Sequence, residues 1–267
     1  MVTLLCTVRD CRQPLDREDR SYACWRGHSF DVAKSGYVNL LQPQDRRSAN
    51  PGDSKEAVAA RRRFLDAGHA APLVRAVVAL GLPHATGAVL DAGCGEGHHL
   101  AAIAASERHG TDISVPAIDA AARRDREALF TVANADRFLP YAPQSFALVL
   151  SINARLNAAE FRRVAAADGR LLVAIPSPDD LLELRTAILP GGEERDRVER
   201  TVALFANDFE LETHERVRHV ATLDRAAIHD VMLSSYRGLR TREQEKLNAL
   251  EPMNVTLGRD LLVFRAR

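Results

Sequence analysis

A glycine-rich stretch, VLDAGCGEGHH at residues 89–99, constrains the fold of this chain more than any other feature. Gly93, Gly95 and Gly97 follow an apolar, strand-like segment and precede a helical one. Glycine has no Cβ, so it adopts unusual backbone angles and lets a ligand approach the main chain. A tight turn between a packed strand and helix needs such residues too, so the glycines alone leave both interpretations open.

The segments after this turn alternate between apolar runs typical of buried strands and amphipathic stretches typical of helices. This order predicts right-handed crossovers, a parallel sheet and a doubly wound α/β fold. We expect 209–221 to be a more exposed strand, 224–237 a helix and 253–267 a final edge strand. The expected strands of the main alternation are 88–93, 109–114, 129–136, 146–153 and 170–177, and the expected helices are 98–106, 116–124 and 157–167.

The first 84 residues have a different character. Residues 1–40 are rich in cysteine, arginine and turn formers, and 42–54 has the composition of a loop. Ser54 caps a predicted helix over 55–69, and a second helix over 72–82 ends near Gly81 and Pro83. We therefore divide the chain into a small N-terminal domain at 1–42, a linker with helices at 43–84 and the α/β domain at 85–267.

The spacing within the turn indicates which ligand it binds. Dinucleotide sites use G-x-G-x-x-G, whereas this chain reads D-x-G-x-G-x-G, with Asp91 and Glu96 in or beside the turn. Acids repel a pyrophosphate but suit a ligand that carries an amino group and a sulfonium. The pattern resembles motif I of class I S-adenosylmethionine methyltransferases. Asp112, about 20 residues further on at a predicted strand end, matches the acid that binds a ribose in doubly wound folds.

This resemblance implies a set of cofactor contacts at one edge of the sheet. Asp112 is expected on the ribose, the sequence NAD at 134–136 beside the adenine, and the SINAR segment at 151–155 along the methyl-acceptor pocket. Asp136 could instead be a turn residue, and Asn153 a helix cap. The predicted cofactor-binding residues are Asp91, Gly93, Gly95, Glu96, Gly97, Asp112, Ile113, Asn134, Asp136, Asn153 and Asp180.

Three of the four cysteines and one histidine gather near the N-terminus. Cys6, Cys11, Cys24 and His28 form C-x4-C-x12-C-x3-H, a spacing within the range of tetrahedral zinc sites. About 40 residues cannot bury an adequate core, so a metal would supply folding energy to such a domain. Metal-free thiols are the alternative. We expect the remaining histidine candidates, His69, His98 and His99, to lie on the surface or in the cofactor pocket.

The combination of this cysteine cluster with FDVAKSGYVNLL, PGDS, ARRRFLDAGH and LDAGCGEG resembles the RlmA family. These bacterial enzymes methylate N1 of a guanine in a hairpin of 23S ribosomal RNA. The resemblance is close over residues 6–97, recognisable to about 186, and architectural beyond. It implies a class I methyltransferase sheet with a small zinc-binding domain, S-adenosylmethionine and Zn²⁺ as cofactors, and Cys6, Cys11, Cys24 and His28 as the zinc ligands.

The chain departs from the family pattern at three places around the expected pocket. It has Ala70 where relatives have tyrosine, Asp180 where they commonly have histidine, and Asn153-Ala154-Arg155 where they have aromatic-Ala-Pro. We expect the Asn153 carbonyl to accept a hydrogen bond at the pocket and Asp180 to be the nearest acid to the guanine N1 proton. Both are our candidate catalytic residues.

The same resemblance implies an RNA hairpin in domain II of the large-subunit RNA as partner, and a homodimer. Arg9, Arg12, Trp25 and Arg26 are expected to contact its phosphates and a base, although solvated surface arginines are equally consistent with the sequence. Two rival functions remain: a divergent methyltransferase with another RNA or small-molecule acceptor, and an rRNA-binding protein with a decayed cofactor site.

Charge and hydropathy limit the remaining possibilities. The formal net charge is zero, which argues against a generic nucleic-acid coat protein, although residues 1–80 carry a small basic surplus. No apolar run approaches the roughly 20 residues of a membrane span, and the N-terminus has no signal-peptide pattern. We expect a cytoplasmic protein without membrane contact, in which thiols stay reduced.

Overall fold

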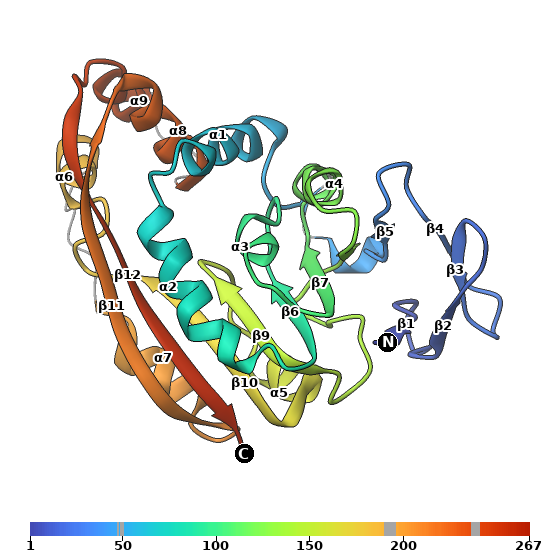
Figure 1. The fold of residues 1–267 in the computed structure, drawn as a ribbon. Coiled ribbons are helices and arrows are strands. Elements are labelled where there is room, and N and C mark those ends of the chain that lie inside the picture. Colours follow the sequence, from blue (N-terminus) through green and yellow to red (C-terminus); the bar gives the residue numbers. More distant parts are fainter. Residues whose placement is uncertain (47, 49–50, 190–195, 236–240) are drawn as a thin grey trace.

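The chain forms a large mixed sheet covered by helices on both faces, with a small antiparallel sheet beside one edge (Figure 1). The structure is a computed structural model, and it describes residues 1–46, 48, 51–189, 196–235 and 241–267. The predicted linker residues 47, 49 and 50 and the predicted helix end at 236–237 lie outside the described residues.

The large sheet has eight strands in the order β11-β12-β10-β9-β6-β7-β8-β5. Neighbours from β10 to β5 pair in parallel, and β12 pairs antiparallel with both β10 and β11. This confirms the predicted doubly wound sheet. Its strands are β5 (Val38–Asn39), β6 (Ala88–Ala92), β7 (Glu107–Asp112), β8 (Leu129–Val132), β9 (Phe146–Ile152), β10 (Ala165–Pro176), β11 (Phe209–Leu223) and β12 (Met253–Ala266).

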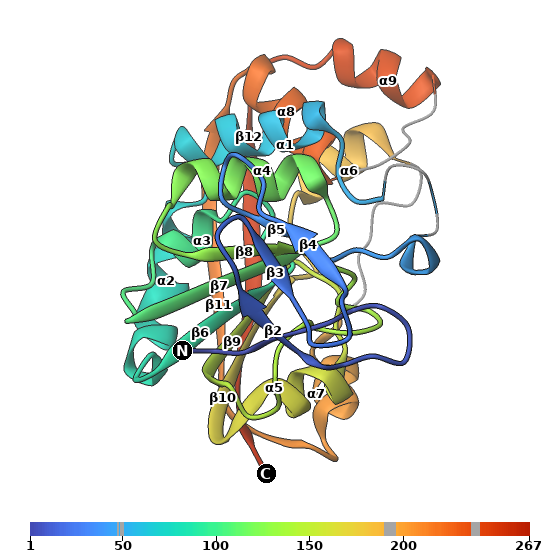
Figure 2. The ribbon, with the colours of Figure 1, turned by 90° about the vertical axis from the view of Figure 1, so that its right-hand side faces the viewer.

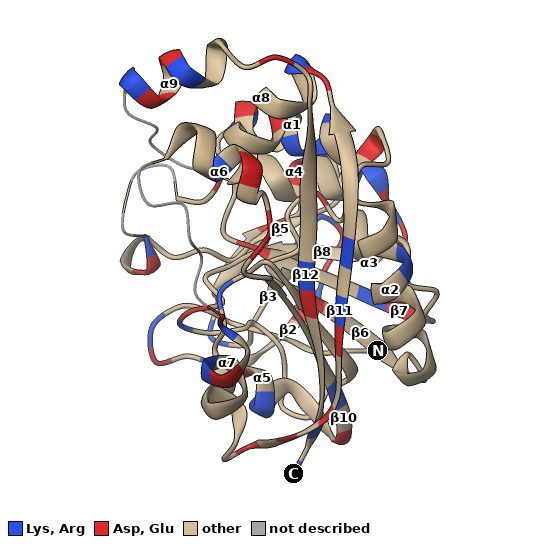
Figure 3. Cartoon of the chain, turned by 90° about the vertical axis from the view of Figure 1, so that its left-hand side faces the viewer, with Lys and Arg blue, Asp and Glu red and all other residues tan. Residues whose placement is uncertain are grey.

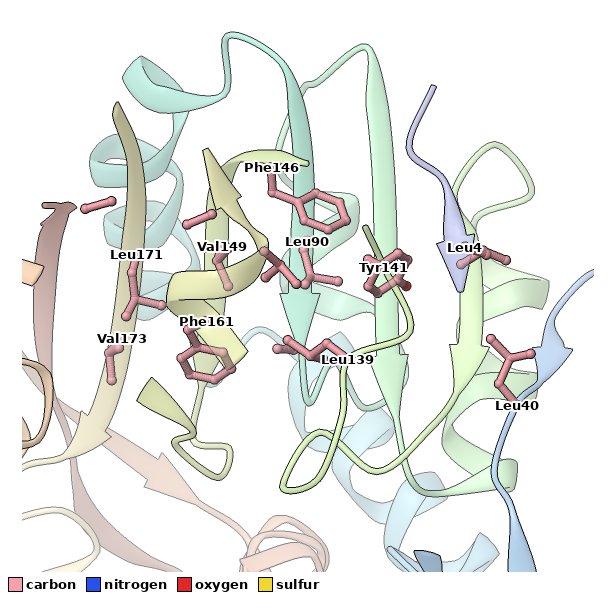
Figure 4. Close-up of a cluster of buried hydrophobic side chains, with 14 of the residues drawn as sticks. Leu4, Leu40, Leu90, Leu139, Tyr141, Phe146, Val149, Phe161, Leu171 and Val173 are labelled. Carbon is pink, nitrogen blue, oxygen red and sulfur yellow. The ribbon is translucent and has the colours of Figure 1, made fainter. Parts of the chain in front are cut away.

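Each face of the sheet is buried under its own helices because alternate residues of a strand point to opposite faces. Leu172 packs with α2 (Ala71–Gly81), α3 (His98–Ala101) and α4 (Val115–Arg124). Leu171 and Val173 pack on the other face with α5 (Ala158–Val164) and α7 (Val198–Phe205). Figure 4 shows this second cluster, which runs from Leu171 and Val173 across Leu90 to Tyr141.

The cluster in Figure 4 includes Leu40, which follows β5, and continues into the N-terminal ribbon through Leu4. The ribbon consists of β1 (Leu4–Leu5), β2 (Pro14–Arg17), β3 (Ser21–Ala23) and β4 (Ser29–Asp31), and β5 follows it in the chain and joins the large sheet. Leu5 N–H donates to Pro140 O at 3.0 Å, and Leu4 bridges to Tyr141. The ribbon is therefore attached beside the β5 edge (Figure 2).

A third helical cluster lies across the end of the large sheet (Figure 1). It joins α1 (Lys55–Asp66), α6 (Leu182–Ile188), α8 (Arg225–Ser235) and α9 (Thr241–Asn248) to β11 and β12. The Ser54 hydroxyl accepts from Ala57 N–H at 3.2 Å, which confirms the predicted cap of α1. The Arg63 guanidinium is hydrogen-bonded to the Asp230 carboxylate and ties α1 to α8.

Three details of the sequence prediction are wrong. The helix expected over 98–106 is the short α3, and the helix expected to reach residue 167 ends at Val164, because Ala165 already pairs with Phe146. The strand expected at the edge, β12, is internal, and β11 is outermost. The apolar run Leu261–Phe264 is buried on both faces, as an internal strand requires.

The edge strand β11 carries its polar side chains into solvent. Acidic and basic residues follow β11 and β12 along their length (Figure 3). Glu210 pairs with Arg265, and Glu212 pairs with Arg170, both at 2.6 Å. Charged side chains on an edge strand oppose pairing with another chain. Within the described residues no single helix is long and apolar enough to cross a membrane; α1 and α2 would reach that length only together, and they meet at 83°.

Candidate functional site

The glycine turn sits between β6 and α3 with left-handed backbone angles. Gly93, Gly95 and Gly97 have φ of 90°, 54° and 73°. A Cβ on Gly93 would lie 2.4 Å from the Cβ of Ala154, so the close approach of the SINAR segment requires glycine there. A Cβ on Gly97 would press on Ala121 and Phe130, so this glycine serves the packing of α4 and β8.

Asp112 ends β7 directly beside the turn. Its carboxylate accepts hydrogen bonds from Gly95 N–H at 3.0 Å and from Ser114 N–H at 2.8 Å. Burial raises the pKa of this carboxyl, and the two backbone donors oppose that rise. Each oxygen keeps a second lone pair for a ligand hydroxyl. The carboxylate is thus oriented by the backbone toward the edge where a ribose would lie.

A cavity of about 770 Å³ opens at the carboxyl ends of the parallel strands. In doubly wound sheets ligands bind at this edge, at the topological switch point, where successive strands are added on opposite sides. Here the switch point lies between β6 and β9. The cavity is lined by every predicted cofactor-binding residue except Gly97, and by Ala70, His98 and His99. The structure therefore brings the predicted residues together, from strands that are far apart in the sequence.

Two buried carboxylates in the cavity have unsatisfied oxygens. Asp91 is 1% exposed, and neither of its side-chain oxygens has a hydrogen-bond partner. Glu96 is 2% exposed, and its Oε1 is also without a partner. Burial, together with the charges of Asp112 and Glu96, raises the pKa of Asp91 to about 8. Buried polar groups are almost always hydrogen-bonded, so these oxygens fit a ligand that carries a cation or hydrogen-bond donors.

Sequence reasoning missed Arg61, which comes from α1 and closes this part of the cavity. Its guanidinium pairs with Glu96 at 2.8 Å and with Asp53 at 2.6 Å. Its Nη2 is buried without a partner, 3.0 Å from the position of a Cβ on Gly95. Arg61 lies four residues after Ala57 and three before Phe64, both on the buried face of α1. An arginine within an apolar stripe is the signal that could have identified it.

The buried groups without hydrogen-bond partners include two carboxylates and one guanidinium nitrogen, so the cavity offers groups of both negative and positive charge. S-adenosylmethionine can be compared with this charge pattern. An amino-acid zwitterion presents one ammonium and one carboxylate. Asp91 and Glu96 offer acceptors for the ammonium, and Arg61 Nη2 offers a donor for the carboxylate. Asp112 offers a hydrogen-bond acceptor for ribose hydroxyls. The residues present therefore fit this cofactor.

The end of β9 forms another wall of the cavity. Asn153 has φ of 53°, a left-handed conformation that asparagine tolerates better than most residues, and its N–H donates to Ala174 O at 2.9 Å. Asn153 does not cap α5; Asn157 does, through Glu160 N–H at 3.3 Å. Nearby, Arg155 pairs with Asp136 at 3.4 Å. Arg155 and Asp136 thus add an ion pair to the cavity lining.

Asp180 is buried and is bound by residues of β12, a contact that sequence reasoning also missed. Its Oδ1 accepts from Gly258 N–H at 3.0 Å and forms an ion pair with the Arg259 guanidinium. Arg259 lines the cavity as well. No local pattern in the strand segment 253–267 marks this arginine, because its partner comes from a distant part of the chain.

The two histidines of α3 line the cavity. Burial, with the nearby charges of His98 and Arg259, lowers the pKa of His99 to about 3, and burial lowers that of His98. Nδ1 of each ring is buried without a hydrogen-bond partner. His69 lies apart from them, with its ring 4.8 Å from the ring of Phe64. The expectation that His98 and His99 are pocket side chains agrees with these positions.

The ribbon brings its four predicted metal ligands into one cluster. One ligand atom from each of Cys6, Cys11, Cys24 and His28 lies within 4.8 Å of the others. His28 Nδ1 is 3.4 Å from Cys6 Sγ and 3.5 Å from Cys24 Sγ, and Cys11 Sγ is 3.9 Å from Cys24 Sγ. These separations suit ligands about a common centre and are far longer than a disulfide bond. A three-sulfur, one-nitrogen donor set fits Zn²⁺.

Comparison with known proteins agrees with both parts of this arrangement. A model of the RlmA N-terminal zinc ribbon matches residues 5–49, and a model described as a methyltransferase domain matches 89–172. The YcgJ protein of Bacillus subtilis has a similar fold, with a TM-score of 0.55 and 17% identity over 73% of this chain and 97% of that one.

Two relatives match most of the sequence. The 23S rRNA (guanine(748)-N(1))-methyltransferase of Streptomyces fradiae is 38% identical over 234 residues, which cover 83% of this chain and 81% of the relative. YxjB of Bacillus subtilis is 34% identical over 221 residues, which cover 76% and 75%.

The sheet, the glycine turn and the cavity with charges of both signs define a class I S-adenosylmethionine-dependent methyltransferase. Its N-terminal ribbon binds zinc. Together with the match to the Streptomyces enzyme, the ribbon match shows that the chain belongs to the RlmA family of 23S rRNA (guanine-N1)-methyltransferases.

Proposed function

We propose that this protein transfers the methyl group of S-adenosylmethionine to N1 of a guanine in a hairpin of 23S rRNA. The observations that carry the proposal are the match to the Streptomyces enzyme over 83% of this chain and the separate match of residues 5–49 to the RlmA N-terminal zinc ribbon. An rRNA acceptor implies action in the cytoplasm. The family resemblance also leads us to propose a homodimer, which sedimentation of the purified protein tests.

At the cofactor end, the proposed contacts follow the charges of the cavity. Asp112 holds the ribose hydroxyls, and Asp91 with Glu96 holds the ammonium of the methionine part. Arg61 Nη2 binds its carboxylate, while the other guanidinium nitrogens remain on Glu96 and Asp53. Asn134, Asp136 and Ile113 line the adenine side. S-adenosylmethionine supplies an electrophilic methyl group, and the protein contributes by fixing its position.

At the acceptor end, the chain orients the guanine rather than providing a strong base. The Asn153 carbonyl accepts hydrogen bonds but cannot take a proton. Asp180 is held by Arg259 and by Gly258 N–H, an arrangement that fixes its carboxylate as a hydrogen-bond acceptor. We propose that these two groups contact the Watson–Crick edge of the base and align N1 with the methyl group. The N1 proton then passes to solvent.

Contacts between the ribbon and the cavity wall support a role of the ribbon in holding the RNA. The segment 133–141 lines the cavity through Asn134 and Asp136, and it contacts the ribbon through its other end. The Arg12 guanidinium lies 3.4 Å from the ring centroid of Phe138 in the same segment. An RNA loop held on the ribbon therefore has a short path to the acceptor end.

Mass mapping of 23S rRNA tests the proposal directly. RNA from a strain without this gene should lack one N1-methylguanine, and the wild-type gene should restore it. An Asp112→Ala gene, whose product loses the ribose contact, should not. An unchanged methylation map in the deletion strain would refute the assigned acceptor.

A divergent acceptor is the second candidate, because Ala70, Asp180 and Asn153-Ala154-Arg155 depart from the pattern that the family resemblance leads us to expect around the pocket. Under that function calorimetry would still detect S-adenosylmethionine binding, but the map of N1-methylguanine would not change. Under the third hypothesis, a decayed RNA-binding protein, calorimetry would detect no cofactor binding at all.

A further inference from the structure

Trp25, the only tryptophan of the chain, lies exposed on the zinc ribbon. Its side chain is 75% exposed, more than any other large apolar residue after Met1 among the described residues. It directly follows Cys24, one of the four clustered metal-ligand residues. Large aromatic side chains usually gain stability by burial, so one held open to solvent on a small domain indicates a binding surface.

The Arg26 guanidinium lies over one face of the Trp25 ring, and the 75% exposure of the side chain leaves the other face for a partner. The indole N–H donates to Gln13 Oε1 at 2.7 Å, so its polar atom is already satisfied. The Arg26 guanidinium lies 5.3 Å from the ring centroid. A ring whose hydrogen-bond donor is engaged recognises a partner through its π face, by stacking rather than by polar contact.

The charges around the ring indicate an anionic partner. The segments Cys6–Cys11 and Cys24–His28 meet at the metal cluster through their end residues. Arg9 on the first segment and Arg26 on the second are exposed, and Asp10 is the only acid between the ligands of either pair. A π face flanked by cations is how proteins bind unpaired nucleotides, with stacking on the base and ion pairs on the phosphates.

We propose that Trp25 is the stacking platform for one unpaired base in the loop of the RNA acceptor, with Arg9 and Arg26 on the adjoining phosphates. This inference rests on the proposed function and deepens it: the ribbon recognises an unpaired loop nucleotide, not duplex RNA. Trp25 acts in RNA binding and does not contact the cofactor.

The single tryptophan makes the test direct, because all indole fluorescence of the full-length protein reports on this residue. Titration with a synthetic 23S rRNA hairpin that carries the target guanine should quench the emission. The same hairpin with abasic sites placed singly in its loop should lose that quenching at one position. A duplex of equal length should quench much less.

Variants separate stacking from charge. Trp25→Ala should weaken hairpin binding about 5- to 100-fold, the range of one base–aromatic stack, whereas Trp25→Phe should stay within a few-fold of wild type. Leu204→Ala, which truncates another exposed apolar residue on α7, is the matched control and should bind normally. Zinc content and S-adenosylmethionine affinity should be unchanged in all three variants.

Two results would overturn the inference while the proposed function stands: methyl transfer to the hairpin without quenching, or Trp25→Ala protein that binds the hairpin as tightly as wild type. Equal quenching by the duplex or by an acidic peptide would also refute base stacking and leave a general anionic surface. Absence of both hairpin binding and methyl transfer would refute the inference and the proposed acceptor together.

Discussion

The unsatisfied Asp91 carboxylate leads to a prediction about stability. Its pKa is raised from 3.8 to about 8 by burial and by the charges of Asp112 and Glu96. An unfolded chain would release this proton near pH 4, whereas the folded protein retains it to about pH 8. Between these values the folded state binds more protons, so its stability falls as pH rises. Asp91→Asn keeps the size of the side chain and removes this titration.

The magnitude follows from the shift. One pKa unit corresponds to about 1.4 kcal/mol, and pH 7 lies about three units above the unfolded pKa. The free energy of unfolding of Asp91→Asn, relative to wild type, should therefore rise by about 4 kcal/mol between pH 4 and pH 7 in the cofactor-free protein. Asp112 also has a raised pKa and contributes to the slope of both proteins, so the difference between them is the relevant quantity.

Urea unfolding at several pH values measures this difference. At pH 7 and without cofactor, Asp91→Asn should gain stability relative to wild type. S-adenosylmethionine should reverse this difference, because its ammonium stabilises the charged Asp91 carboxylate but not the amide of the variant. Wild type should gain more stability from the cofactor than Asp91→Asn, and calorimetry should show at least tenfold weaker binding by the variant. Parallel pH profiles of the two proteins without cofactor would refute the reasoning.

Three further predictions concern the turn, the zinc and the cofactor end. Gly93→Ala should lower the free energy of unfolding in urea by about 2–4 kcal/mol, because it adds a steric clash to backbone strain. Gly36→Ala is the control, because its Cβ would meet nothing within 4 Å, and it should lower the free energy of unfolding clearly less. Metal analysis should find about one zinc per wild-type chain and little in Cys24→Ala; equal zinc in both would contradict the ligand set. Arg61→Ala should weaken S-adenosylmethionine binding about 10- to 100-fold, with little effect on binding of 5′-methylthioadenosine, which lacks the amino-acid part. The control variant Arg62→Ala should bind both ligands normally. Equal losses of affinity for the two ligands in Arg61→Ala would exclude a carboxylate contact.

Local patterns predicted the parts of the site that depend on position along a strand. Asp91 and Asp112 end neighbouring parallel strands, so apolar runs followed by acids were enough to place both at the same edge. Cys6 and Cys11 are separated by four residues, yet their sulfur atoms lie in one cluster with that of Cys24. A short segment keeps its two cysteines close together even when its loop is longer than usual. Helix lengths were less predictable, since α5 ends where Ala165 begins to pair with β9.

The sequence by itself determined the doubly wound sheet, the glycine turn and the cluster of three cysteines and one histidine, because periodicity and short spacings encode them within a few residues. The tertiary structure alone decided which distant charges complete the cavity. Arg61 reaches Glu96 from a helix that precedes the sheet, and Arg259 reaches Asp180 from the last strand. It also decided that β12 lies inside the sheet and β11 at its edge. Such contacts depend on how helices and strands pack in space, which no local pattern of residues specifies.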